Sequence, residues 1–218
     1  MPREDFQRNL NEVQDDVVKL GSMVEWAIFK SIDCLKNRDM EGSQQVIDED
    51  DVIDDMTQSI EDRCIDLIAL EAPMASDLRG IISALMVSNE LERMGDYAEG
   101  IAKISIAMGN LPPLKPLIDI PRMADKAANM VHQSLESYVN KDAESAYEVV
   151  KSDDEVDSLY DQVYRELLTY MMADPSTIQR ATYLLWVAHD LERVADRTTN
   201  IAERVIYLVT GSPIKKKF

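Results

Sequence analysis

Apolar residues recur along the first third of the chain at spacings of three and four, which is the period of an amphipathic α-helix. The first such series predicts one long helix over residues 5–36, and it comprises Phe6, Leu10, Val13, Val17, Leu20, Val24, Ala27 and Leu35. A second series repeats every seven residues and predicts a helix that ends before Pro73; its members are Val46, Ile53, Ile60 and Leu67. The next helix is expected to have Pro73 in its first turn and to continue to about Met108.

The second half of the chain shows the same plan. Apolar periodicity predicts helices over about 121–139, 142–172 and 175–209. Asp174 has the side chain of a good N-cap, and Pro175 suits the first helical position because proline lacks the N–H that a helix start leaves unpaired. Each half therefore contains three long helices.

Two blocks of sequence recur in the same order in both halves. Residues 37–54 match residues 140–157 at an offset of 103, and residues 89–102 match residues 189–202 at an offset of 100. Matches of this kind are the signature of an internal repeat. Short connections between helices of about 45 Å require antiparallel packing. The predicted fold is all-α, with two tandem antiparallel three-helix bundles related by internal duplication.

Composition marks the division between the halves. Residues 1–110 are expected to form the first three-helix repeat and residues 122–210 the second. The segment 111–121 contains four prolines and is interpreted as a connection. Residues 211–218 form a short basic tail, whose three lysines are interpreted as a solvated chain end or a weak lipid contact.

The formal net charge of −18 excludes a non-specific nucleic-acid binder, which needs clustered Lys and Arg. The chain shows no apolar window long enough to span a membrane and no secretory signal, so a cytoplasmic protein without membrane insertion is expected. Cys34 and Cys64 lack a pairing signal and are interpreted as small apolar residues of a reducing compartment.

Acidic residues interrupt an apolar helix face at the same place in each half. In the first half, Glu92 and Asp96 lie on the line of Leu78, Ile81 and Leu85. In the second half, Glu192 and Asp196 follow Ile178, Ala181 and Leu185 in the same way. With 41 acidic residues in the chain, pairs four apart are common, so their position matters more than their spacing.

A second acidic pair precedes each of these motifs by one helix. Asp50 and Asp54 flank the apolar seam of the first half, and Asp153 and Asp157 flank the seam of the second. If the helices on either side of residue 72 form an antiparallel hairpin, Asp54 and Glu92 lie at similar heights. Four carboxylates are then expected at each seam.

Carboxylates so placed repel one another unless a cation lies between them. Oxygen-only ligands suit Mg²⁺, Mn²⁺, Ca²⁺ or iron, and without a His or Cys cluster they do not form a structural zinc site. The competing interpretation is that Arg93 and Arg193 pair with these acids in interhelical salt bridges. The residues alone leave both open.

These motifs resemble those of the PhoU family of phosphate transport regulators over essentially the whole chain. The resemblance rests on DDVID and DDEVD in the two acidic blocks, on APMASDLRGIISAL, and on ELERMGDYAEGIA and ATYLLWVAHDLERVADRTTNIAE around the later motifs. The chain departs from the family pattern at Ala195 for glycine, at Tyr97 and Arg197 for a frequent histidine, and at Gly100 for an asparagine that the second repeat keeps.

The resemblance implies a non-enzymatic, cytoplasmic and homodimeric repressor of phosphate uptake and phosphate signalling. Its implied partners are the ATPase subunit of a phosphate ABC transporter, which would hold it at the inner face of the membrane, and a sensor histidine kinase. The resemblance also implies metal at the E(D)xxxD motifs, iron foremost and Mn, Mg or Zn otherwise. The implied ligands are Glu92, Asp96, Glu192, Asp196, Asp50, Asp54, Asp153 and Asp157.

Two alternatives accompany this interpretation. Helical bundles with acidic pairs also form di-iron oxidases and ferritin-like stores, although such sites combine Glu with an ExxH motif that is missing at both motifs here. A structural bundle that binds no metal is the other alternative.

Overall fold

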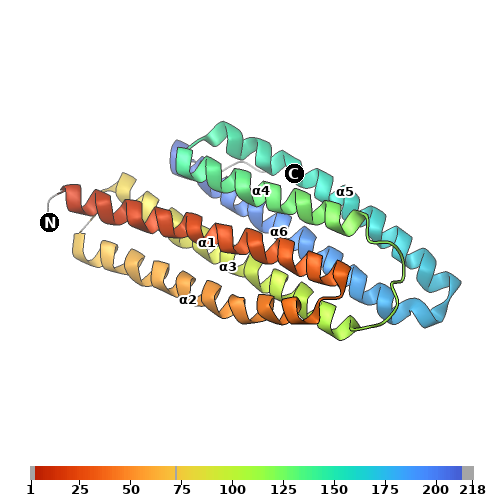
Figure 1. Ribbon diagram of the computed structural model, residues 1–218. Helices are drawn as coiled ribbons and strands as arrows, with labels where there is room; N and C mark the ends of the chain where they lie inside the picture. Colours follow the sequence, from red (N-terminus) through yellow and green to blue (C-terminus); the bar gives the residue numbers. More distant parts are fainter. Residues whose placement is uncertain (1–2, 72, 213–218) are drawn as a thin grey trace.

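The computed structural model describes residues 3–71 and 73–212, and within these residues it contains helices and no strand. The elements are α1 (Arg3–Asn37), α2 (Met40–Glu71), α3 (Ala75–Met108), α4 (Asp119–Asn140), α5 (Ala143–Ala173), the 3₁₀ turn η1 (Pro175–Thr177) and α6 (Ile178–Thr210). Figure 1 shows the helices as long rods that lie along one another, with α1, α2 and α3 on one side and α4, α5 and α6 on the other. The predicted all-α fold with two three-helix repeats is confirmed.

The second helix of each half begins with the same tight turn. Arg38 and Lys141 have positive φ values of 57° and 51°. The aspartate that follows each of them caps the helix: Asp39 Oδ1 accepts a hydrogen bond from the Gly42 N–H at 2.8 Å, and Asp142 Oδ1 accepts one from the Glu144 N–H at 2.9 Å. The repeated sequence therefore encodes the turn as well as the helix.

The predicted starts of α6 and α3 both differ from the structure. Asp174 accepts a hydrogen bond from the Ser176 N–H at 2.9 Å with Pro175 in first position, so it is an N-cap as predicted, but it caps the 3₁₀ turn η1, and α6 itself begins at Ile178. The prediction that Pro73 lies in the first turn of α3 is wrong. The first helical hydrogen bond runs from the Leu78 N–H to the Met74 carbonyl at 2.8 Å, which leaves Pro73 outside the helix.

Helices α3 and α6 pack side by side at the centre of the molecule, and α1 also packs against α4. Contacts across α3 and α6 show that the two run antiparallel: Asn200 donates to Glu90, while Gly100 faces Asp190. Buried apolar side chains from all six helices form one continuous core. The two repeats are consequently joined through their interiors as well as by the chain.

The proline-containing connection between α3 and α4 is tied down by three basic side chains. Lys115 is 7% exposed, and its ammonium pairs with Glu166 on α5. Arg38 donates to the Gly109 carbonyl at 2.8 Å, and Arg180 donates to the Pro112 carbonyl at 3.2 Å. The connection thus crosses between the halves in one fixed path.

Three further predictions concern the basic tail, membrane-spanning helices and the two cysteines. The three lysines of the predicted basic tail lie outside the described residues. Across the described part of the chain, no helix is both long and apolar enough to cross a membrane. Cys34 and Cys64 are buried and free.

Gly21 lies where α1 packs closely against α4 of the other half. A Cβ at this position would lie 2.1 Å from Leu135 Cδ1 on α4. Gly21→Ala is therefore expected to lower the free energy of unfolding by about 1–3 kcal/mol through overpacking, measured by urea denaturation.

Gly80→Ala is the matched control. A Cβ at Gly80 meets nothing closer than Leu10 Cδ2 at 3.6 Å, so the gain in helix propensity of about 1 kcal/mol should prevail. Equal effects of the two substitutions would contradict the assignment of Gly21 to a close helix contact.

Candidate metal centre at two carboxylate clusters

The four acids predicted in the first half come together where α2 packs against α3. We call Asp50, Asp54, Glu92 and Asp96 the first cluster. Burial raises the pKa of Asp50 from 3.8 to about 7, and the charges of Glu99, Asp54 and Asp96 add to the rise. Burial and the charge of Asp96 also raise the pKa values of Asp54 and Glu92. The predicted similar height of the two pairs is therefore seen in the fold.

The second half repeats the arrangement between α5 and α6. We call Asp153, Asp157, Glu192 and Asp196 the second cluster. Burial raises the pKa of Asp153 to about 7, with further contributions from Asp157, Asp196 and Glu192. The pKa values of Asp157 and Glu192 are raised by burial and by Asp196. The eight residues predicted from the sequence thus form two clusters of four.

The clusters lie at the edges of the helix seams rather than inside the core. The side chains of Glu92 and Glu192 are 20% and 21% exposed, and those of Asp96 and Asp196 are 40% and 38% exposed. Leu91 and Leu191, immediately before the glutamates, are fully buried. The apolar residues therefore hold the helices together and leave the carboxylates half-buried along the border.

Because position 95 is a glycine, Asp50 can approach α3 more closely than it could if this position carried a side chain. A Cβ at this position would lie 3.0 Å from Asp50 Oδ1 and 3.2 Å from Ile53 Cγ2. Ala195 takes the equivalent place in the second repeat and is fully buried. The two clusters therefore share a layout, but the aspartate of α2 faces a glycine on α3 while the second repeat has an alanine at the equivalent place on α6.

Among the residues that the structure describes, Arg93 and Arg193 form ion pairs only with acids of their own helices. Arg93 contacts Asp96 at 2.8 Å and Glu92 at 3.2 Å, and Arg193 makes the equivalent pairs with Asp196 and Glu192. The sequence-based alternative is therefore right that these arginines pair with the acids and wrong that the salt bridges are interhelical, because each arginine pairs within its own helix. Among the described residues, no ion pair reaches the aspartates on α2 and α5: Asp50, Asp54, Asp153 and Asp157.

The donor set fits a cation, although the side chains are not gathered around one point. Within the described residues, no three His, Cys, Asp or Glu side chains are placed as a ready-made metal group. Two buried oxygens of the second cluster, Asp153 Oδ1 and Glu192 Oε2, nevertheless have no hydrogen-bond partner. Buried oxygens without a hydrogen-bond partner, beside carboxyl groups whose pKa values are raised at Asp153, Asp157 and Glu192, are what a bound cation would satisfy. Such a cation would supply positive charge shared between two helices.

The two clusters approach each other across the contact between α3 and α6. Arg197 on α6 donates to Glu90 on α3 at 3.1 Å, and its charge partly offsets the raised pKa of Glu92. A hollow of about 480 Å³ lies at this crossing. It is lined by Tyr97, Arg193, Asp196, Arg197, Thr199 and Asn200. Of the eight cluster acids, Asp196 lines this hollow.

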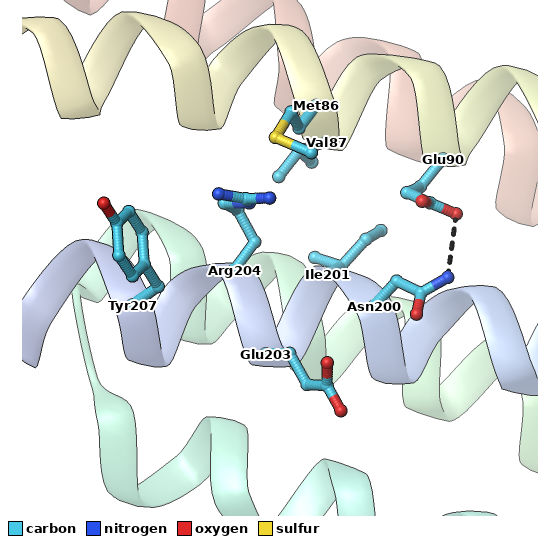
Figure 2. Close-up of a pocket in the computed structure, with 8 residues that line it drawn as sticks. All are labelled: Met86, Val87, Glu90, Asn200, Ile201, Glu203, Arg204 and Tyr207. Atoms are coloured by element: carbon cyan, nitrogen blue, oxygen red, sulfur yellow. Dashed lines mark hydrogen bonds between the residues drawn. The ribbon is translucent and has the colours of Figure 1, made fainter. Parts of the chain in front are cut away.

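A groove of about 410 Å³ follows the same helix pair further along and is shown in Figure 2. Its lining residues are Met86, Val87, Glu90, Asn200, Ile201, Glu203, Arg204 and Tyr207. In this view Asn200 reaches across to Glu90, and Arg204 extends between the two helices. None of the eight predicted ligands lines this groove, so the candidate site is the pair of clusters.

Sequence reasoning missed Glu99, Glu90 and Arg197, which act on or beside the clusters. Glu99 is not among the residues that recur in both repeats, because Thr199 takes its place in the second. Its position on the helix could have indicated it, because residue 99 lies on the same face of α3 as residues 92 and 96.

Comparison with known proteins agrees with this architecture. The PhoU domain family model matches residues 17–105 and 120–205, one match for each repeat. The chain is 39% identical over 215 residues to the phosphate-specific transport system accessory protein PhoU homolog of Clostridium acetobutylicum, covering 98% of each. It is 42% identical over 208 residues to the homolog of Aquifex aeolicus, covering 95% of this chain and 94% of that one.

Solved structures give the same result. The crystal structure of PhoU from Pseudomonas aeruginosa superposes with a TM-score of 0.91 at 35% identity, covering 95% of this chain and 100% of that one. The phosphate transport system regulatory protein PhoU from Streptococcus pneumoniae gives a TM-score of 0.89 at 30% identity, covering 96% and 99%. These are helical accessory and regulatory proteins of a transport system. The chain belongs to the PhoU family, as its motifs indicated.

The raised pKa values of Asp50 and Asp153 generate a prediction on pH dependence. Each has a pKa of about 7 in the folded protein and 3.8 ordinarily. Between these values the folded state keeps a proton that the unfolded state has released. The free energy of unfolding of metal-free protein should therefore fall as the pH rises from about 4 to about 7, by at most about 1.4 kcal/mol per pH unit for each group.

Asp50→Asn and Asp153→Asn replace the protonated form and should flatten this slope, as measured by urea unfolding with chelator between pH 5 and 8. Asp48→Asn, an exposed acid on α2, is the control and should leave the slope unchanged. A wild-type slope that neither cluster substitution alters would refute the assignment.

Proposed function

We propose that this protein is a negative regulator of phosphate uptake that acts as an adaptor on a phosphate ABC transporter. The observation that carries the proposal is family membership across both repeats. A second line of support is that relatives of nearly equal length are named accessory proteins of a phosphate-specific transport system. Those names describe accessory proteins rather than enzymes, in agreement with the sequence-based expectation.

The partner in this proposal is the cytoplasmic ATPase subunit of the transporter, with a sensor histidine kinase as a second partner and a homodimer as the working form. The surface supports a binding role. Trp26, Phe29 and Trp186 are large side chains that are 40%, 46% and 53% exposed. Exposed aromatic residues are enriched at protein interfaces.

The metal component of the proposal assigns a cation to each cluster, with iron as the first candidate and Mn, Mg or Zn as the others. The first cluster would hold it through acids of α2 and α3, and the second through acids of α5 and α6. Support comes from two buried oxygens that have no hydrogen-bond partner, Asp153 Oδ1 and Glu192 Oε2, and from the acids on α2 and α5, which form no ion pair within the described residues. Bound metal would fix the angle between the two helices of each pair.

The regulatory proposal predicts a loss of repression in cells that lack the gene. Phosphate uptake should rise in a deletion strain when phosphate is plentiful and return to normal when the intact gene is restored. The tagged protein should also co-purify with the transporter ATPase. Unchanged uptake together with no captured ATPase would reject the adaptor role.

The metal proposal predicts a change in metal content. In protein purified without chelator or polyhistidine tag, the double substitution of Glu92 and Asp96 by Ala should lower bound metal by about half, because the two clusters are separate sites. Elemental analysis by mass spectrometry is the measurement. The double substitution of Asp62 and Asp66 by Ala, an exposed acidic pair four apart on α2, is the control and should leave the content unchanged.

Equal metal content in both variants would reject the assignment of the first cluster. Oxygen consumption with added Fe²⁺ separates the di-iron alternative from the regulator, since an adaptor binds metal without turnover.

A further inference from the structure

A groove of about 430 Å³ lies between α1 and α2 of the first repeat. These two helices run beside each other along one side of the molecule (Figure 1). Met23 and Trp26 of α1 line the groove together with the buried Ile53 of α2. Phe29, one turn after Trp26, and Val52, one turn after Glu49 of the lining, are 46% and 47% exposed. We call Met23, Trp26, Phe29 and Val52 the α1/α2 patch.

The second repeat has polar residues at the positions equivalent to this patch. The offset of 103 extends back from residues 37–54 into the preceding helix, because α1 and α4 end at the equivalent residues Asn37 and Asn140. At this offset the four patch residues correspond to Lys126, Asn129, His132 and Glu155. Lys126 and Glu155 form an ion pair that joins α4 to α5. The three-helix repeat therefore folds without an apolar patch at these positions, so packing of the bundle does not account for it.

Acidic residues border the α1/α2 patch on the α2 side. Glu49 lines the groove, and Asp48 and Asp55 each lie about one turn from Val52. These three acids are exposed, and none of them forms an ion pair within the described residues. On the α1 side the lining includes Lys19. The α2 border is thus negative and favours a partner that brings basic residues to it.

The dimensions and the charge of the groove together suit one kind of occupant. Its lining extends along α1 from Lys19 to Trp26, a length of about 10 Å at 1.5 Å per residue. Two turns of a bound helix cover this length and present apolar anchors at positions i, i+3 or i+4, and i+7. A second copy of this chain would place acidic borders against each other, and each copy carries a formal net charge of −18. A helix with an apolar face and a basic edge matches both the patch and its border.

We propose that the α1/α2 groove is a docking site for a basic amphipathic helix of a partner protein. Apolar side chains of that helix pack on the patch, and its Lys or Arg residues lie against the acids of α2. The inference rests on the adaptor role of the proposed function, so the helix is expected in the ATPase subunit of the transporter. Because polar residues replace the patch in the second repeat, each chain offers one such site.

Binding of the purified ATPase subunit to the full chain, measured by biolayer interferometry, tests the proposal. Trp26→Ala and Phe29→Ala should each raise Kd about tenfold or more, the loss expected when an aromatic anchor of an interface is removed. Asn129→Ala and His132→Ala change the equivalent exposed positions of α4 and are the matched controls, which should leave Kd unchanged. Thermal unfolding of each variant checks that the fold is kept.

Glu49→Lys tests the charge of the occupant. It should slow association with the ATPase and weaken the dependence of the association rate on salt, because charges at the edge of an interface act mainly on encounter. Hydrogen exchange of the ATPase in the complex should show protection of a helix in which Lys or Arg residues border apolar ones.

ATPase binding that Trp26→Ala, Phe29→Ala and Glu49→Lys all leave unchanged would overturn the inference and keep the adaptor role. Protection of an acidic or non-helical segment of the ATPase would overturn the assigned occupant. A shift of the Trp26→Ala variant from dimer to monomer, with ATPase binding unchanged, would assign the groove to a second copy and overturn the inference as well. If the wild-type protein does not bind the ATPase, the inference and the ATPase partner of the proposed function both fail.

Discussion

Mutual repulsion of half-buried carboxylates along two helix seams is the constraint that the rest of this structure has to accommodate. The repulsion pushes α2 away from α3 and α5 away from α6, and the apolar residues directly beneath the acids oppose it. Ile53 and Leu91 in the first half, and Val156 and Leu191 in the second, are buried at these levels. Because the core is continuous between the halves, each seam is held by packing that extends well beyond its own helix pair.

The duplication preserves the layout of the clusters while the contact between the repeats has diverged. Glu90 on α3 receives hydrogen bonds from Arg197 and Asn200 on α6. Its equivalent, Asp190, faces Gly100 instead and has His189 as its ion-pair neighbour at 3.5 Å. In a perfect repeat Glu90 and Asp190 would have equivalent partners, but here only Glu90 is paired with an arginine. The two halves are related in fold and unequal in electrostatics.

Apolar periodicity was sufficient to predict the six helices because long amphipathic helices leave a strong signal. The repeat indicated which acids lie along the helix seams, since residues that keep their place in both halves stand out among 41 acidic residues. Their role as metal ligands stays a prediction. Besides Glu99, Glu90 and Arg197, two further features could not be predicted. The start of α3 depends on which carbonyl accepts the first hydrogen bond, and Met74 has no capping side chain to announce it. The ion-pair partner of Arg93 depends on the direction of its side chain. Asp96 on the same helix and Asp54 on the neighbouring helix are both acids, and the sequence does not distinguish between them.

The length of α2 beyond the first cluster has a mechanical consequence. The helix continues for 17 residues from Asp54 to its end at Glu71, a distance of about 25 Å. A change of about 5° in the angle between α2 and α3 at the cluster would therefore move the far end by about 2 Å. Leu70, near the end of α2, and Met74, just before α3, are 78% and 69% exposed. A change in the charge of the carboxylates at the centre of α2 would in this way shift the exposed apolar residues at the end of the helix.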